Sequence, residues 1–77
     1  MTTIARAQRA INKARVPLEI VRGEGYHYFI YESARKGLYE TVSVMIPYTN
    51  MLSAQDWVTQ ARWAYEGIKE RIEQRGY

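Results

Sequence analysis

The sequence contains no cysteine, and this absence excludes several kinds of chemistry at once. The chain can form no disulfide, offers no thiolate nucleophile and cannot bind a metal ion through sulfur. It has a single histidine, His27, so a metal site with two histidines from one chain is excluded as well. We therefore expect no cofactor, and a chain without disulfides is expected in the cytoplasm.

Long apolar runs are also absent. No stretch approaches the roughly 20 apolar residues of a membrane-spanning helix, and residues 1–15 lack the apolar core of a secretory signal peptide. At 47% hydrophobic and 13% aromatic residues, the composition is nevertheless that of a folded protein. The 77 residues predict one domain over 1–77. A domain this small is near the limit at which oligomerisation often supplies missing burial.

Positive charge is concentrated at the N-terminus. The chain carries eleven Lys and Arg against eight Asp and Glu, a net charge of +3. Residues 1–18 contain Arg6, Arg9, Lys13 and Arg15 but no acidic residue. Such a local field either attracts phosphate or an acidic protein surface, or belongs to a solvated face that aids solubility.

Residues 3–15 predict a short helix, since alanine and long straight-chain side chains dominate them. Thr2 or Thr3 can cap its start, and Val16-Pro17 is expected to end it. At 100° per residue one stripe of this helix is apolar and the opposite side is basic. The apolar stripe consists of Ile4, Ala7, Ile11 and Ala14, and the basic side of Arg6, Arg9 and Lys13.

The middle of the chain predicts three strands. Residues 18–22, 26–32 and 39–46 alternate or are dense in aromatic and β-branched side chains. Turns are expected at 23–25, where two glycines can adopt positive φ, and at 33–37. Short connections favour an antiparallel meander, and Pro47 ends the third strand because it lacks an amide donor.

Residues 53–74 predict the longest element. Ser53 and Asp56 have the spacing of a capping box. A stripe about 120° wide can cover one face of a three-stranded sheet. It consists of Ala54, Trp57, Val58, Ala61, Ala64, Tyr65, Ile68 and Ile72. The order α-β-β-β-α predicts a two-layer α+β fold, in which the meander packs against two helices.

The inventory of reactive groups favours no enzyme. His27 shares a strand face with Phe29 and Tyr31, where a histidine is usually packed or hydrogen-bonded. An enzyme would need His27 to line a pocket beside an acid such as Glu24 or Glu32. The glycines at 23–25 lack the spacing of a phosphate-binding loop and lead into a strand. We predict neither catalysis nor a small-molecule substrate.

One candidate protein interface lies on the last helix. Trp63 is roughly opposite the centre of the apolar stripe, next to Gln60, Gly67 and Glu70. A tryptophan is costly to leave in water, and Gly67 weakens the helix by ~1 kcal/mol relative to alanine. A dimer across this helix would bury both residues. Alternatively, Trp63 packs against residues 47–52 or the C-terminal tail.

The sheet face that the helices leave open is a second candidate surface. Depending on register it carries either Tyr26, Tyr28 and Ile30 or His27, Phe29 and Tyr31, next to Tyr39, Thr41, Ser43 and Met45. Exposed aromatic rings can stack on unpaired bases or anchor a protein contact. Alternatively they only stabilise the sheet by cross-strand packing. With Arg6, Arg9 and Lys13, the tyrosines Tyr26, Tyr28 and Tyr39 would form a nucleic-acid surface.

Two resemblances bear on function. The element order is similar to that of the double-stranded-RNA-binding domain, but residues 53–57 read Ser-Ala-Gln-Asp-Trp where that domain carries lysines. The order and strand pattern of an RNA-recognition motif are missing.

Four segments of the chain resemble small uncharacterised phage- or prophage-encoded proteins. They are residues 21–29 (VRGEGYHYF), the Ala- and Arg-rich first helix, Ser43-Val44 near Tyr48, and the Leu52 to Trp57 segment. This resemblance implies a phage or bacterial source, hence the cytoplasm of a bacterium or host cell, and carries over no active site.

The sequence thus predicts a non-enzymatic binding protein that acts as a protein–protein interaction module. A second copy of the chain, in a homodimer, is one partner considered, and no membrane partner is expected. Nucleic-acid binding is the alternative.

Overall fold

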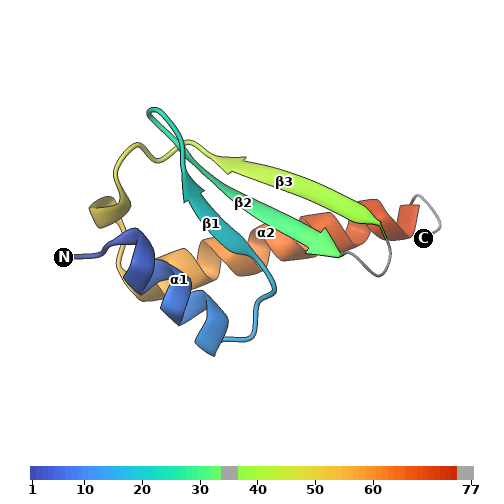
Figure 1. The fold of residues 1–77 in the computed structure, drawn as a ribbon, viewed down its shortest axis with the longest axis horizontal. Coiled ribbons are helices and arrows are strands. Elements are labelled where there is room, and N and C mark those ends of the chain that lie inside the picture. Colours follow the sequence, from blue (N-terminus) through green and yellow to red (C-terminus); the bar gives the residue numbers. More distant parts are fainter. Residues whose placement is uncertain (34–36, 75–77) are drawn as a thin grey trace.

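The computed structural model describes residues 1–33 and 37–74 and confirms the predicted order of helices and strands (Figure 1). The elements are α1 (Ile4–Lys13), β1 (Glu19–Arg22), β2 (His27–Ser33), β3 (Leu38–Val44), the 3-10 helix η1 (Thr49–Met51) and α2 (Ala54–Gln74). The predicted boundaries differ from these by two residues at most. Much of the turn expected at 33–37 lies outside the described residues.

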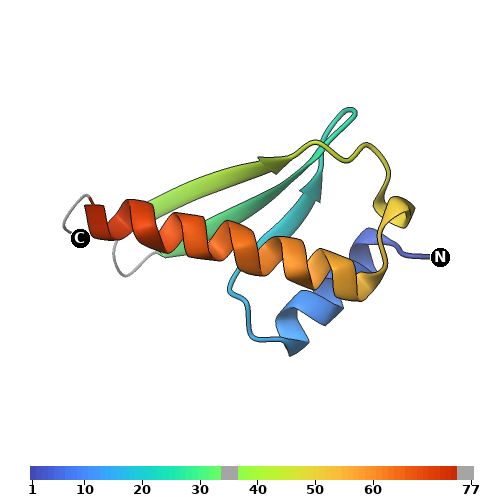
Figure 2. The same cartoon turned by 180° about the vertical axis from the view of Figure 1, so that it is seen from behind.

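The strands form one antiparallel sheet in the order β1-β2-β3, and both helices lie on the same face of it (Figure 2). α1 packs beside β1 and against α2. Ala7 of α1 and Ala61 of α2 are fully buried, and such small side chains let helices approach closely. The predicted two-layer α+β fold is therefore confirmed.

Strand pairing decides which side chains face the helices. Phe29 of β2 lies opposite Ile20 of β1 and Val42 of β3. Phe29 and Ile20 are buried in the core, and Val42 packs against it. Because side chains alternate along a strand, Tyr28 and its neighbours point to the other, uncovered face. Of the two registers that the sequence allowed, the structure has the one with Tyr28 and Ile30 on the open face.

The turn between β1 and β2 uses its two glycines differently. Gly25 has a φ of 76°, a conformation that other residues rarely adopt. Gly23 has no positive φ, but a Cβ atom there would lie 2.6 Å from Cζ of Tyr26. A side chain at position 23 would therefore displace the Tyr26 ring, which lies directly over Gly23.

A side-chain amide of α1 covers the outer edge of β1. Oε1 of Gln8 accepts a hydrogen bond from the Ile20 amide at 2.8 Å, and Nε2 of Gln8 donates to the Leu18 carbonyl at 3.0 Å. Gln8 thus satisfies the backbone groups that an additional strand would otherwise pair.

α1 ends two residues earlier than predicted, and proline is not the direct cause. The amide of Arg15 bonds to the Asn12 carbonyl, and the amide of Val16 bonds to the Ile11 carbonyl. These two bonds form a Schellman motif, in which the residue after the C-cap adopts the left-handed conformation. Here that residue is Arg15, with a φ of 60°.

Replacing Arg15 by glycine is expected to stabilise the protein. The left-handed conformation costs a non-glycine residue roughly 1–2 kcal/mol, and part of this gain is offset by the larger entropy of glycine in the unfolded chain. We expect Arg15→Gly to raise the free energy of unfolding by about 0.5–1 kcal/mol in urea titrations. Lys13→Gly, at an ordinary helical position, should lower it by about 1 kcal/mol. Equal effects of the two variants would contradict this account.

Candidate functional site

Trp63 is the largest apolar side chain that α2 leaves in solvent. It is 66% exposed, whereas Trp57, on the same helix, is completely buried. The alternative that Trp63 packs against residues 47–52 is difficult to reconcile with this exposure. The C-terminal tail, residues 75–77, lies outside the described residues.

The surface around Trp63 leaves room for another molecule. On the adjacent turn, a Cβ atom added to Gly67 would meet nothing within 4 Å. Gln60 is half-buried and Glu70 is exposed. We call the outward side of α2 that carries these four residues the Trp63 face.

A different side of α2 is occupied within the chain. The ring of Tyr65 lies 6.0 Å from the ring of Tyr31 in β2, and Nζ of Lys69 lies 4.9 Å from the centre of the Tyr65 ring. Glu66 holds Lys69 by a hydrogen-bonded ion pair of 3.0 Å, which raises the pKa of the Lys69 ammonium. The side chains of Tyr65, Glu66 and Lys69 thus contact one another or the sheet beside the Trp63 face.

The three basic side chains of α1 lie together, as the helical spacing predicted. Arg6, Arg9 and Lys13 are exposed, and with Ala10 and Ala54 they line a shallow depression between α1 and the start of α2. The guanidinium of Arg6 donates a hydrogen bond to the Met1 carbonyl at 3.3 Å. This surface can offer cationic donors to an anion.

The open sheet face is partly aromatic. Tyr39 is 60% exposed, whereas Tyr26 and Tyr28 are half-buried, with their rings 5.9 Å apart. Met45, which follows β3, is 73% exposed. Tyr26 and Tyr28 therefore stabilise the turn and each other, and Tyr39 is the most accessible ring of this face.

The fold separates the two halves of the predicted nucleic-acid surface. α1, which carries the basic side chains, belongs to the helical layer (Figures 1 and 2). Tyr28 and Tyr39 lie on the opposite face of the sheet, because they alternate along their strands with the buried Phe29 and Leu38. A nucleic-acid chain stacked on Tyr28 and Tyr39 would have to pass around an edge of the sheet to reach Lys13. The two groups are thus separate surfaces.

The only histidine is part of a buried polar cluster. His27 is fully buried between the Ile46 carbonyl, 2.6 Å from Nδ1, and Oγ1 of Thr49, 2.8 Å from Nε2. Because a carbonyl only accepts, Nδ1 carries the proton, and in the neutral ring Nε2 accepts from the Thr49 hydroxyl. The indole of Trp57 donates to the Thr49 carbonyl at 2.8 Å and lies against the His27 ring.

Sequence reasoning expected His27 to be packed or hydrogen-bonded but left open which face of the sheet it lies on, and it missed Thr49. Thr49 is a single polar residue in no periodic pattern, and its partner His27 is distant along the chain. No signal in the sequence distinguishes it from the exposed Asn50 beside it.

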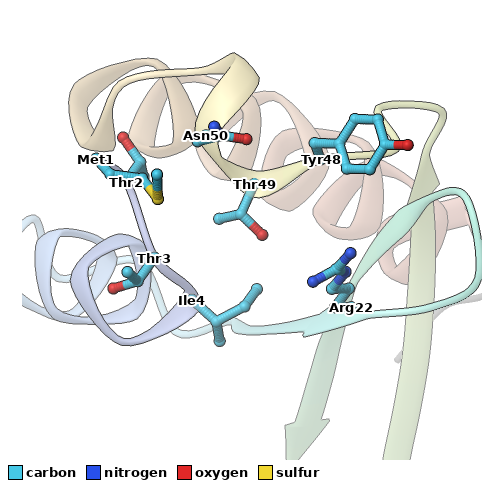
Figure 3. Close-up of a pocket in the computed structure, with 8 residues that line it drawn as sticks. All are labelled: Met1, Thr2, Thr3, Ile4, Arg22, Tyr48, Thr49 and Asn50. Carbon is cyan, nitrogen blue, oxygen red and sulfur yellow. The ribbon is translucent and has the colours of Figure 1, made fainter.

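A hollow of about 270 Å³ lies where the start of α1, the end of β1 and η1 meet (Figure 3). The guanidinium of Arg22 points into it, and Thr49 borders it from η1. Its lining includes no carboxylate and does not include His27. The condition stated above for an enzyme, His27 lining a pocket beside an acid, is therefore not met at this hollow.

Among residues 1–33 and 37–74, no group of His, Asp or Glu side chains is arranged to hold a metal ion. No helix in the described part of the chain has the length and apolar character to cross a membrane. In comparisons with protein-family models, curated proteins and solved structures, nothing matches this chain.

Replacing Thr49 by valine tests the buried polar cluster. Valine keeps the shape but removes the hydroxyl, which leaves Nε2 of His27 buried without a partner. We expect Thr49→Val to lower the free energy of unfolding by about 1–3 kcal/mol. Asn50→Ala, on the exposed neighbour, should change it by less than about 0.5 kcal/mol. Urea unfolding followed by tryptophan fluorescence would measure both, and equal stabilities would contradict a structural role for this hydrogen bond.

Proposed function

We propose that this chain is a non-enzymatic protein-interaction module and that it works as a homodimer formed through the Trp63 face. The observation that carries the proposal is the exposure of Trp63 beside the open space at Gly67. A large aromatic ring and a gap of this kind on one helix are self-complementary, which is what a two-fold interface requires. The phage or prophage origin and the cytoplasmic location stay predictions.

An antiparallel pair of α2 helices, centred midway between Trp63 and Gly67, matches the two features. Each Trp63 ring then lies over Gly67 of the second copy, where the missing side chain permits close approach. Tryptophan is among the residues that contribute most to binding when buried at the centre of an interface. The Trp63 face thereby supplies both the anchor and its binding site.

The charges on α2 favour the antiparallel arrangement. In this register Gln60 lies opposite Glu70 of the second copy, and Thr59 lies opposite Arg71 of the second copy. No two charges of the same sign face each other among these pairs. A parallel pair would instead place Glu70 against Glu70, which costs free energy.

Two variants on α2 separate association from folding. Trp63→Ala removes the anchor from an exposed position, so we expect the monomer to keep its stability and the dimer to weaken at least tenfold. Gly67→Gln should stabilise the isolated helix by roughly 0.5–1 kcal/mol and yet weaken the dimer, because its side chain fills the space for Trp63. Solution mass by light scattering and unfolding in urea would measure the two effects.

The control is Gln55→Ala, an exposed position at the start of α2 away from the Trp63 face. It should leave the mass unchanged. A single helix pair is a small interface, so roughly micromolar dissociation constants are expected. If wild-type protein and Trp63→Ala have the same mass at every concentration, the proposed dimer is wrong.

Nucleic-acid binding through α1 is the second candidate, and the clustering of Arg6, Arg9 and Lys13 around one depression favours it. The tyrosines of the open face would not take part in the same contact, as described above. The small number of cations makes this function the weaker proposal.

Replacing Arg6, Arg9 and Lys13 together by glutamine tests this second candidate. Retention of the protein on single- or double-stranded nucleic acid should be lost, and wild-type affinity should fall steeply with salt because phosphate contacts release counterions. Dimerisation through the Trp63 face should depend on salt only weakly. Unchanged retention of the glutamine variant would remove α1 as a nucleic-acid surface.

A further inference from the structure

β3 forms an edge of the sheet that no described element covers. In both views of the fold, no helix or strand lies beyond β3 on the side away from β2 (Figures 1 and 2). Its seven residues contain no proline and no lysine, two residues that often protect an edge from pairing.

The hydrogen bonds of the turn establish which backbone groups of β3 point outward. The amide of Gly23 donates to the Tyr26 carbonyl, so this pair is hydrogen-bonded, and the pairs beyond it alternate between bonded and non-bonded. Ile20 is then in a non-bonded pair with Phe29, and its amide points away from β2. The bond from the Ile20 amide to Gln8 confirms this assignment independently.

The same alternation continues across β2. Tyr28 and Ile30 bond to β1, so Phe29 bonds to Val42 of β3. Along β3, every second residue bonds to β2, and the residues that alternate with them direct their N–H and C=O groups away from the sheet. These residues are Tyr39, Thr41 and Ser43.

The outward backbone groups of the two edge strands thus differ in whether they have a hydrogen-bond partner. At the β1 edge, the amide of Gln8 occupies the outward Ile20 N–H and Leu18 C=O. At the β3 edge, no hydrogen bond within the described chain occupies the outward groups of Tyr39, Thr41 or Ser43. An uncovered edge of this length is a template for another strand.

We propose that β3 pairs antiparallel with β3 of a second copy, centred on Thr41, so that two three-stranded sheets form one sheet of six strands. β3 runs from Leu38 to Val44, and its middle residue, Thr41, is one of the outward-facing residues. Symmetric pairing therefore aligns the whole strand, with Thr41 opposite Thr41 and Tyr39 opposite Ser43 of the second copy.

Side chains in this register are compatible. On the open face, Thr41 meets its own copy, a pair that can exchange a hydroxyl hydrogen bond. The one charged residue of β3, Glu40, lies on the helix-facing side and opposite Val42 of the second copy, so no like charges oppose. A centre at Ser43 would instead bring Pro47 of the second copy opposite Tyr39, where an amide donor is needed.

This contact is distinct from the Trp63 face, because it uses the edge of the sheet and not the outer side of α2. A chain with two different two-fold contacts assembles beyond the dimer, into a closed tetramer or an open row. The inference therefore goes beyond the proposed function and can fail separately from it.

Thr41→Pro is the decisive variant. Proline removes only the outward N–H at the centre of the contact, and such a position on an edge strand tolerates it. Thr41→Val is the matched control, because it keeps the N–H and is a good strand former. We expect Thr41→Pro to weaken association of the Trp63→Ala protein at least tenfold, and Thr41→Val, which loses only the hydroxyl pair, to weaken it by about fivefold at most.

Amide hydrogen exchange measured by NMR provides a second readout. At high protein concentration the amides of Tyr39, Thr41 and Ser43 should exchange at least tenfold more slowly than at low concentration, whereas the amides of Glu40 and Val42 should not change. If Thr41→Pro fails to fold, Thr41→Lys keeps the N–H and places two lysines against each other, and it should weaken association to a similar extent.

The outcomes separate the two proposals. If Trp63→Ala is monomeric at every concentration and the outward amides remain unprotected, pairing through β3 is wrong; the α2 dimer is then supported only if the wild-type protein associates under the same conditions. If Trp63→Ala still associates and Thr41→Pro abolishes that association, pairing through β3 is supported. Equal association of Thr41→Pro and Thr41→Val would overturn it.

Discussion

The buried hydrogen bonds of His27 are the constraint on which the arrangement of the two layers depends. His27 belongs to β2, its partners belong to the segment that leaves β3, and the indole of Trp57 bonds to the same Thr49. The cluster therefore joins the sheet to the start of α2. With Trp57 held inward, Trp63 lies about 120° further around the helix axis, beyond the edge of the core. The exposure of Trp63 is therefore a consequence of the burial of Trp57 on the same helix.

The order of helices and strands was predictable because apolar residues recur at helical spacing in the first and last segments and strand-like residues fill the middle of the chain. The capping box of Ser53 and Asp56 is present, with the Asp56 amide bonded to Oγ of Ser53 at 3.1 Å. The register of the sheet was not predictable, because both faces of β2 carry aromatic or branched residues. In the structure Phe29 is buried against the helices, which leaves Tyr28 and Ile30 on the open face. Contacts of Gln8 and Thr49 were also beyond prediction, since their partners are distant along the chain and neither residue belongs to a pattern.

The sequence predicted which residues share one side of a helix more reliably than which surfaces lie next to each other. Helical spacing correctly placed Arg6, Arg9 and Lys13 on one exposed side of α1, and Trp63 on the outer side of α2. It could not show which residues of β2 lie on the sheet face that the helices leave open. A small two-layer domain has different surfaces on its helical side, its sheet side and its sheet edge.

The amide of Gln8 also has a consequence for how this fold opens. The outer edge of β1 is satisfied only while α1 is docked, because the groups that complete it come from the helix. Release of α1 therefore exposes the backbone of β1 to water, and loss of β1 removes a partner of α1. The two elements should open and close as one cooperative unit in the native state, separately from the β2–β3 hairpin. A chain in which this unit has opened presents both edges of its sheet, and such partly open species are the ones from which aggregation begins.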